Sequence, residues 1–201
     1  MGAHLVFIDE SGFCLIPPVR KTWAPKGQTP VLTHRYRHER ISVIAGLSVS
    51  PKRLRCGLYF DFSTDNINGE AAAEFLRQLL RHLPGPIIVL WDNVAFHRSR
   101  PVKDLLARTT RLHLEAFPPY APDLNPVEHV WSVVKSDLAN GRPDDVHDLL
   151  GDLTHRITQT ALSQRRLRRC VHEAQLSLFD LAIALLMQIS IKAGALSGCG
   201  A

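Results

Sequence analysis

The chain has 201 residues, 45% of them hydrophobic, which suffices for one substantial core but not for two independent ones. Its 24 Lys and Arg against 19 Asp and Glu give a net charge of +5, which suits either a polyanionic partner or simple solubility. The four cysteines (14, 56, 170 and 199) are far apart and form no C-x-x-C pair, so neither a disulfide framework nor a zinc knuckle is supported. The first residues do not match a secretory signal, and we expect a cytoplasmic protein with reduced thiols.

The first third of the chain predicts strands. Leu5–Ile8 is a short apolar run that leads directly into Asp9. Proline-rich turns then predict a hairpin or long loop around a short strand near Thr22–Ala24. Ile41–Ser50 and Leu54–Phe62 are rich in β-branched and aromatic residues. We expect antiparallel strands here, the first of them short or irregular.

Two stretches are strongly basic. Residues 34–40 read H-R-Y-R-H-E-R and include Arg35 and Arg37, and residues 164–169 contain four arginines. Each stretch has two interpretations, a solvated surface segment or a contact with nucleic-acid phosphates.

From residue 69 the pattern alternates between helix and strand. Apolar residues recur every three or four positions over 69–83 and predict an amphipathic helix that ends at Pro84. Ile87–Leu90 is a buried strand with Asp92 at its carboxyl end. Val102–Ala107 predicts a helix and Arg111–Ala116 a further strand. The expected class is α/β, with a mixed five-stranded sheet and helices on both faces.

The next segment is a rigid loop that leads into a helix. Prolines 118, 119 and 122 exclude helix up to about Asp123. Asn125 is a good N-cap, Pro126 suits the first helical position, and Glu128 is the third. We therefore expect a helix from about Asn125 to Leu138. The structural interpretation of Glu128 is an acid that bonds back to the Asn125 backbone.

Two further segments complete the chain. Val146–Leu162 predicts another helix. Leu176–Ile191 is apolar but contains Asp180 and Gln188, and it predicts a packed or partner-binding helix rather than a membrane span. We expect a catalytic domain over residues 1–170 and a helical tail over 171–201.

Three acids fall at the ends of predicted elements: Asp9 and Asp92 follow strands, and Glu128 opens a helix. If the two strands are neighbours, Asp9 and Asp92 lie side by side and repel each other unless cations intervene. Divalent ions with oxygen ligands fit this arrangement, and phosphoryl transfer with two metal ions is the chemistry that it supports. Glu10, Asp61 and Asp123 are rival acids, although strand alternation directs Glu10 away from Asp9.

Four motifs also carry a family resemblance. They are I-D-E-S-G-F at 8–13, T-W-A-P-K-G at 22–27, W-D-N-V-A-F-H at 91–97 and P-P-Y-A-P-D-L-N-P-V-E-H-V-W at 118–131. In this order they resemble the DDE transposase domain of the IS630 and Tc1/mariner superfamily, over about residues 5–169. The resemblance implies a ribonuclease H-like fold with Asp9, Asp92 and Glu128 as catalytic metal ligands. It also implies Mg²⁺ or Mn²⁺, two ions, DNA ends and target DNA as partners, and a homodimer.

The resemblance suggests roles for four more residues. Asn93 and His97 would support the site, with the alternative that they only hold the loop after the strand. Trp23 and Lys26 would belong to a hairpin near the active face or the DNA. Trp131 is expected in the core rather than as a stacking surface.

The chain departs from the family pattern at its start, because family members carry a helix-turn-helix region before the first catalytic strand. Two expectations follow: a partner encoded in a separate helix-turn-helix reading frame, or a truncated copy. The expected function is metal-dependent DNA cleavage and strand transfer. The alternative is a non-catalytic remnant that binds DNA or full-length transposase and inhibits it.

Overall fold

The structure is a computed structural model, and it describes residues 2–16, 19–31, 39–92, 99–117, 122–141 and 143–174. A five-stranded sheet forms its centre, with the strand order β3-β2-β1-β4-β5. The strands are β1 (His4–Cys14), β2 (Arg40–Val49), β3 (Cys56–Ser63), β4 (Ile87–Trp91) and β5 (Leu112–Ala116). β1 is antiparallel to β2 but parallel to β4, so the mixed five-stranded sheet is confirmed.

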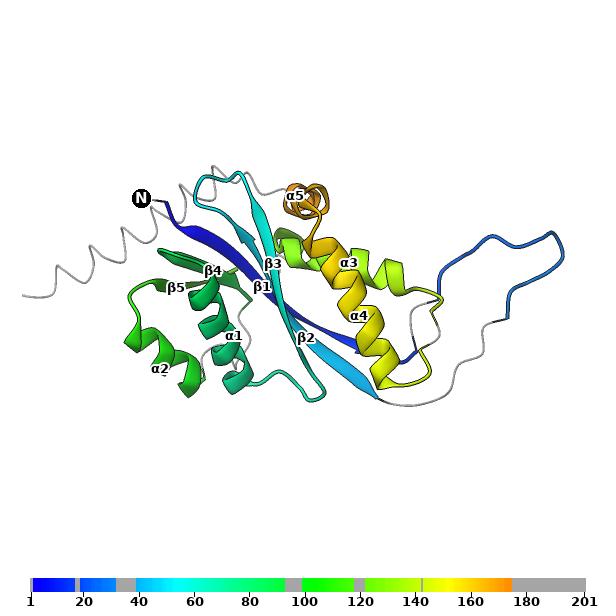
Figure 1. Cartoon of the computed structure of the whole chain (residues 1–201), viewed down its shortest axis with the longest axis horizontal. Helices are drawn as coiled ribbons and strands as arrows, with labels where there is room; N and C mark the ends of the chain where they lie inside the picture. Colours follow the sequence, from blue (N-terminus) through cyan, green and yellow to red (C-terminus); the bar gives the residue numbers. More distant parts are fainter. Residues whose placement is uncertain are drawn as a thin grey trace, which may run out of the picture.

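Helices cover both faces of the sheet, as predicted (Figure 1). One face is covered by α1 (Gly69–His82) and α2 (Arg100–Arg108). The other is covered by α3 (Pro126–Leu138), α4 (Val146–Ala161) and α5 (Gln164–Glu173). A short 3-10 helix, Pro122–Leu124, precedes α3.

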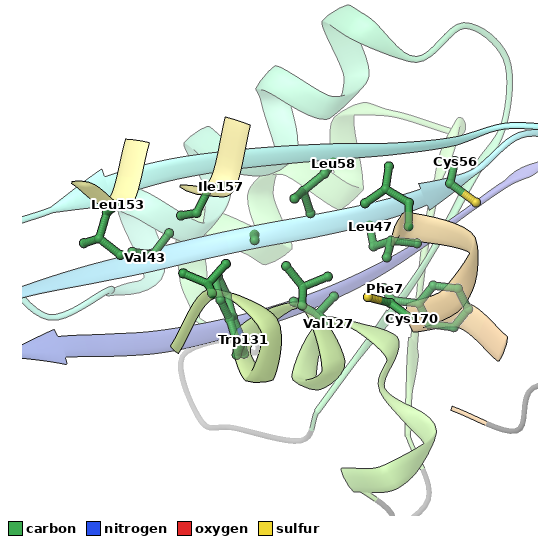
Figure 2. Close-up of a cluster of buried hydrophobic side chains, with 14 of the residues drawn as sticks. Phe7, Val43, Leu47, Cys56, Leu58, Val127, Trp131, Leu153, Ile157 and Cys170 are labelled. Carbon is green, nitrogen blue, oxygen red and sulfur yellow. The ribbon is translucent and has the colours of Figure 1, made fainter. Parts of the chain in front are cut away.

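Alternation along the central strand divides the core into two clusters. Leu5 and Phe7 of β1 face α3, α4 and α5, whereas Val6 and Ile8 face α1 and α2. The α3 face is the larger cluster, and Trp131 packs into it against the strands (Figure 2). β1 is buried on both faces because it lies in the middle of the sheet, which explains its unbroken apolar start.

One predicted strand is wrong. Residues 19–31 contain no strand and form an exposed arm that extends from the body (Figure 1). Prolines 25 and 30 lack the N–H that a strand ladder needs, and this explains the difference. The arm is anchored at Arg20, whose backbone exchanges two hydrogen bonds with the side chain of Asn140 and whose guanidinium donates to Ser136 Oγ.

The expected boundary between residues 170 and 171 falls inside α5, and the division into domain and tail stays a prediction. The apolar segment 176–191 lies outside the described residues. Within the described ranges, no helix is both long and apolar enough to cross a membrane.

The close approach of β2 to α1 gives a test of this packing. A Cβ at Gly46 would lie 3.2 Å from Val6 Cγ1 and 3.3 Å from a Phe75 ring carbon. We expect Gly46→Ala to lower the free energy of unfolding by about 1–3 kcal/mol, because the core must shift to accept it. Gly12→Ala in β1 is the control, since nothing lies within 4 Å of its Cβ. Equal losses for both variants in urea unfolding would contradict this packing.

Candidate active site

The register of the parallel strands places Asp9 and Asp92 at the same level. Phe7 pairs with Leu90 at the end of the β1–β4 ladder, and each aspartate lies two residues further along its chain. Neighbouring strands are about 4.8 Å apart. Asp9 lies within β1, which continues to Cys14, and not at the end of the strand as predicted, whereas Asp92 directly follows β4. The two residues therefore occupy adjacent positions beside the carboxyl end of β4.

The face of the sheet separates Asp9 from two of its rivals. Asp9 has the same strand parity as Leu5 and Phe7, which face α3. Glu10 is on the opposite face and accepts a hydrogen bond from the Trp91 indole N–H at 3.0 Å. Asp61 is also on that face, where it accepts from Gln78 of α1 at 3.3 Å. The predicted orientation of Glu10 is confirmed, and Asp61 does not share a face with Asp9.

The start of α3 is fixed to β1 by one buried side chain. Asn125 is the N-cap, as predicted, and its Oδ1 accepts a hydrogen bond from the Val127 N–H at 3.1 Å. Its Nδ2 donates to the carbonyl of Ile8 at 3.1 Å, one residue before Asp9. Asn125 therefore sets the position of the turn that carries Glu128. Glu128 itself is exposed.

A second contact from α3 reaches Asp9 directly. Trp131 is almost fully buried, and its indole N–H donates to Asp9 Oδ2 at 2.9 Å. The prediction that Trp131 is a core residue is confirmed, and this hydrogen bond adds a polar role. It fixes one carboxylate oxygen of Asp9.

Asp9 lies in an environment that opposes its negative charge. Burial raises the pKa of its carboxyl to about 7, and the charges of Glu128 and Glu10 act in the same direction. The Trp131 hydrogen bond opposes this shift because it favours the ionised form. Glu128 is thus near enough to Asp9 for the two charges to interact.

The donor set suits a hard divalent cation. Asp9, Asp92 and Glu128 offer only carboxylate oxygens, the ligands that Mg²⁺ prefers. A cation would also offset the repulsion that raises the pKa of Asp9. Among the described residues, no three His, Cys, Asp or Glu side chains already converge on one point as metal ligands.

The remaining predicted site residues are less closely placed. Arg35, Arg37, Asn93 and His97 lie outside the described residues. Trp23 lies on the arm with its side chain fully exposed. Lys26 is in the predicted turn with Gly27, closed by the Gln28 N–H to the Pro25 carbonyl at 3.0 Å. Their contact with DNA stays a prediction.

Sequence reasoning missed the contacts of Asn125 and Trp131 with β1. The sequence predicted the cap and the burial from local pattern, but both contacts cross more than 115 residues of chain. An N-cap amide has a second polar group that needs a partner when buried, and so has a buried indole N–H. That requirement was the available signal.

The strand order and the layers of helices define a ribonuclease H-like fold, the class that the four motifs predict. Residues 4–150 match the family of DDE superfamily endonucleases, and the chain belongs to this family. It is 26% identical over 150 residues to the Transposable element Tc1 transposase of Caenorhabditis elegans, covering 70% of this chain and 54% of that protein. The chain thus spans about half the length of this curated relative.

Solved structures show the same fold. The Mos1 transposase paired-end complex with left transposon end matches with a TM-score of 0.64 at 22% identity, covering 85% of this chain and 52% of that chain. The catalytic domain of Mos1 mariner transposase matches with a TM-score of 0.51 at 18% identity, covering 85% of this chain and 81% of that one.

The raised pKa of Asp9 predicts how stability depends on pH without metal. Its folded value of about 7 exceeds the ordinary 3.8, so stability falls as pH rises between these values. A shift of about three units corresponds to about 4 kcal/mol. The free energies of unfolding of Asp9→Asn and of wild type are measured in urea with EDTA. We expect the advantage of Asp9→Asn over wild type to be larger at pH 8 than at pH 5. Asp61→Asn, on the opposite face, controls for the general loss of one carboxylate. A pH-independent difference for Asp9→Asn would contradict the prediction.

The Trp131 hydrogen bond can be tested against its counterpart on the other face. Trp131→Phe keeps an aromatic ring but removes the donor to Asp9, and we expect a loss of about 1–3 kcal/mol in the free energy of unfolding. The loss should be larger at pH 8 than at pH 5, because the N–H stabilises the ionised carboxylate. Trp91→Phe removes the donor to half-buried Glu10 and should cost less, since water can replace it. The same loss for both variants at both pH values would mean that Trp131 stabilises the protein by packing alone and not through its hydrogen bond.

Proposed function

We propose that this chain is the catalytic part of a DNA transposase that cuts DNA at the ends of a mobile element and joins the cut end to target DNA. The observation that carries the proposal is the placement of Asp9 and Asp92 level on neighbouring strands, with Glu128 on the helix fixed beside them. Membership of the DDE superfamily endonucleases supports it. The comparisons with Tc1 and Mos1 transposases favour it over the non-catalytic remnant.

Asp9, Asp92 and Glu128 hold two divalent ions in this proposal. When bound, the ions lower the pKa of the attacking hydroxyl and stabilise the leaving oxygen. The Mos1 mariner paired end complex has been crystallised both with Mn and with Mg, which supports either ion here. The protein's own contribution is to hold the ligands still, with Asn125 positioning the Glu128 turn and Trp131 fixing one oxygen of Asp9.

The reaction consists of two phosphoryl transfers. In the first, a water oxygen bonds to phosphorus while the bond to the 3′ oxygen breaks, and that oxygen takes up a proton. In the second, the freed 3′-hydroxyl attacks a phosphate of the target, whose leaving oxygen is protonated in turn. The DNA partners are proposed from the family resemblance and from the transposon-end complex of Mos1. The homodimer is proposed from the resemblance alone.

The test is a Mg²⁺-dependent nicking assay on supercoiled plasmid and on DNA carrying the element ends. We expect activity in wild type and its loss with EDTA. Asp9→Asn, Asp92→Asn and Glu128→Gln should each reduce the rate at least about 100-fold, because metal-assisted charge stabilisation supplies several kcal/mol.

Asp61→Asn is the matched control, since it neutralises an exposed carboxylate on the opposite face. We expect it to retain activity. The catalytic proposal fails if wild type and Asp92→Asn nick equally, or if neither nicks. Mg²⁺ should also raise the melting temperature of wild type but not of Asp9→Asn, a readout independent of DNA.

A further inference from the structure

Two basic segments that are distant in the sequence form one surface beside the edge of the sheet. The turn between β2 and β3 carries Lys52, Arg53 and Arg55, and α5 carries four arginines. In Figure 1 this turn and α5 lie next to each other at the end of β3. No acidic residue occurs between residues 40 and 60 or between 153 and 172.

Hydrogen bonds fix the position of the β2–β3 turn relative to α5. The Gln164 side chain donates to the Cys56 carbonyl at 2.6 Å and accepts from the Cys56 N–H at 3.1 Å. The guanidinium of Arg168 donates to the carbonyl of Leu54. The charges of the turn and of the helix are therefore fixed relative to each other before any ligand arrives.

The charged face of α5 is directed outward. Arg165, Arg168 and Arg169 are exposed, the last two following Arg165 by three and four residues, whereas Leu167 and Cys170 are buried. Arg169 is paired with Glu173 at 2.7 Å. Among the described residues, no hydrogen bond or ion pair occupies the side chain of Lys52, Arg55 or Arg165. We call these five exposed residues, Lys52, Arg55, Arg165, Arg168 and Arg169, the basic surface.

α5 connects the basic surface with the candidate active site. It lies against α3 in the opposite direction: Arg166 approaches Asp137 near the end of α3 at 3.5 Å, and Glu173 approaches His129 in its first turns at 3.7 Å. His129 is the neighbour of Glu128. A helix of 10 residues is about 15 Å long. That length corresponds to about four base pairs of B-DNA at 3.4 Å each.

We propose that the basic surface binds the phosphate backbone of duplex DNA and directs the duplex along α5, from Glu128 toward the β2–β3 turn. The binding surface rests on charge and geometry alone, whereas the direction toward Glu128 rests on the proposed function. A duplex fits because it presents a regular line of phosphates, about one charge per 1.7 Å of axis, to cations on two segments that hydrogen bonds hold together. Arginine also suits phosphate through bidentate contacts.

The test compares two triple variants of the 201-residue chain with the same change in net charge. Lys52→Gln/Arg55→Gln/Arg165→Gln removes three cations of the basic surface. Arg81→Gln/Lys103→Gln/Arg108→Gln removes three exposed cations from α1 and α2, on the other face. Affinity for a 30-base-pair duplex of arbitrary sequence is measured by fluorescence anisotropy in EDTA, from 50 to 300 mM KCl.

We expect the surface variant to bind about tenfold or more weakly at 50 mM KCl. Its slope of log K against log salt should fall by about 2 to 3, since each phosphate contact contributes about 0.9. The control variant should keep the wild-type slope. Urea unfolding checks that both variants fold.

Equal slopes for the surface variant and wild type, or equal losses in both variants, overturn the proposal. So does a surface variant that loses binding to phosphatidylserine vesicles while its DNA binding is unchanged, because the surface would then serve a membrane. The assay contains no metal, so its outcome is separate from nicking. If wild type binds DNA as expected but never nicks it with Mg²⁺, the proposed function is refuted. The proposal that the basic surface binds DNA is then still supported.

Discussion

The candidate site depends on the attachment of α3 to β1 at two successive residues. Asn125 holds the Ile8 carbonyl, and Trp131 holds the Asp9 carboxylate. Both donors are buried, where an unpaired polar group is costly, so the helix has little freedom to slide or rotate on the sheet. Glu128 lies between the two attachments and takes its position from them. The cap Asn125 and the candidate ligand Glu128 therefore belong to the same fixed turn.

This attachment holds together charges that repel. The burial of Asp9 and the nearness of Glu128 destabilise the ionised site in the absence of a cation. The apolar cluster on the α3 face, which includes Trp131 (Figure 2), provides the stability that offsets this. Clustered carboxylates lower the stability of the protein without a cation and bind a cation well. Functional sites commonly lower stability in this way.

Much of this arrangement could be predicted from the sequence, because local patterns carried it. The five strands, the helices α1 to α4 and the start of α3 followed from apolar patterns, prolines and a capping residue, whereas α5 was not predicted as a separate helix. The same rules failed for Thr22–Ala24, where a strand needs a partner that the arm does not have. The contacts of Asn125 and Trp131 with β1 could not be predicted from the sequence for a different reason. A contact between residues far apart in the chain leaves no periodic pattern in the sequence. The roles of Asp9, Asp92 and Glu128 stay predictions until they are tested chemically.

The two hydrogen bonds between Gln164 and Cys56 affect how a second copy of the chain could pair with the sheet. β3 is an edge strand, and such edges readily accept a strand from another chain. Here the outer N–H and carbonyl of Cys56 are taken by a side-chain amide that imitates a neighbouring strand. Near the other end of β3, the Phe62 N–H is taken by the Asp61 carboxylate. These contacts occupy backbone groups near both ends of β3 and so leave fewer of them for a strand of a second copy.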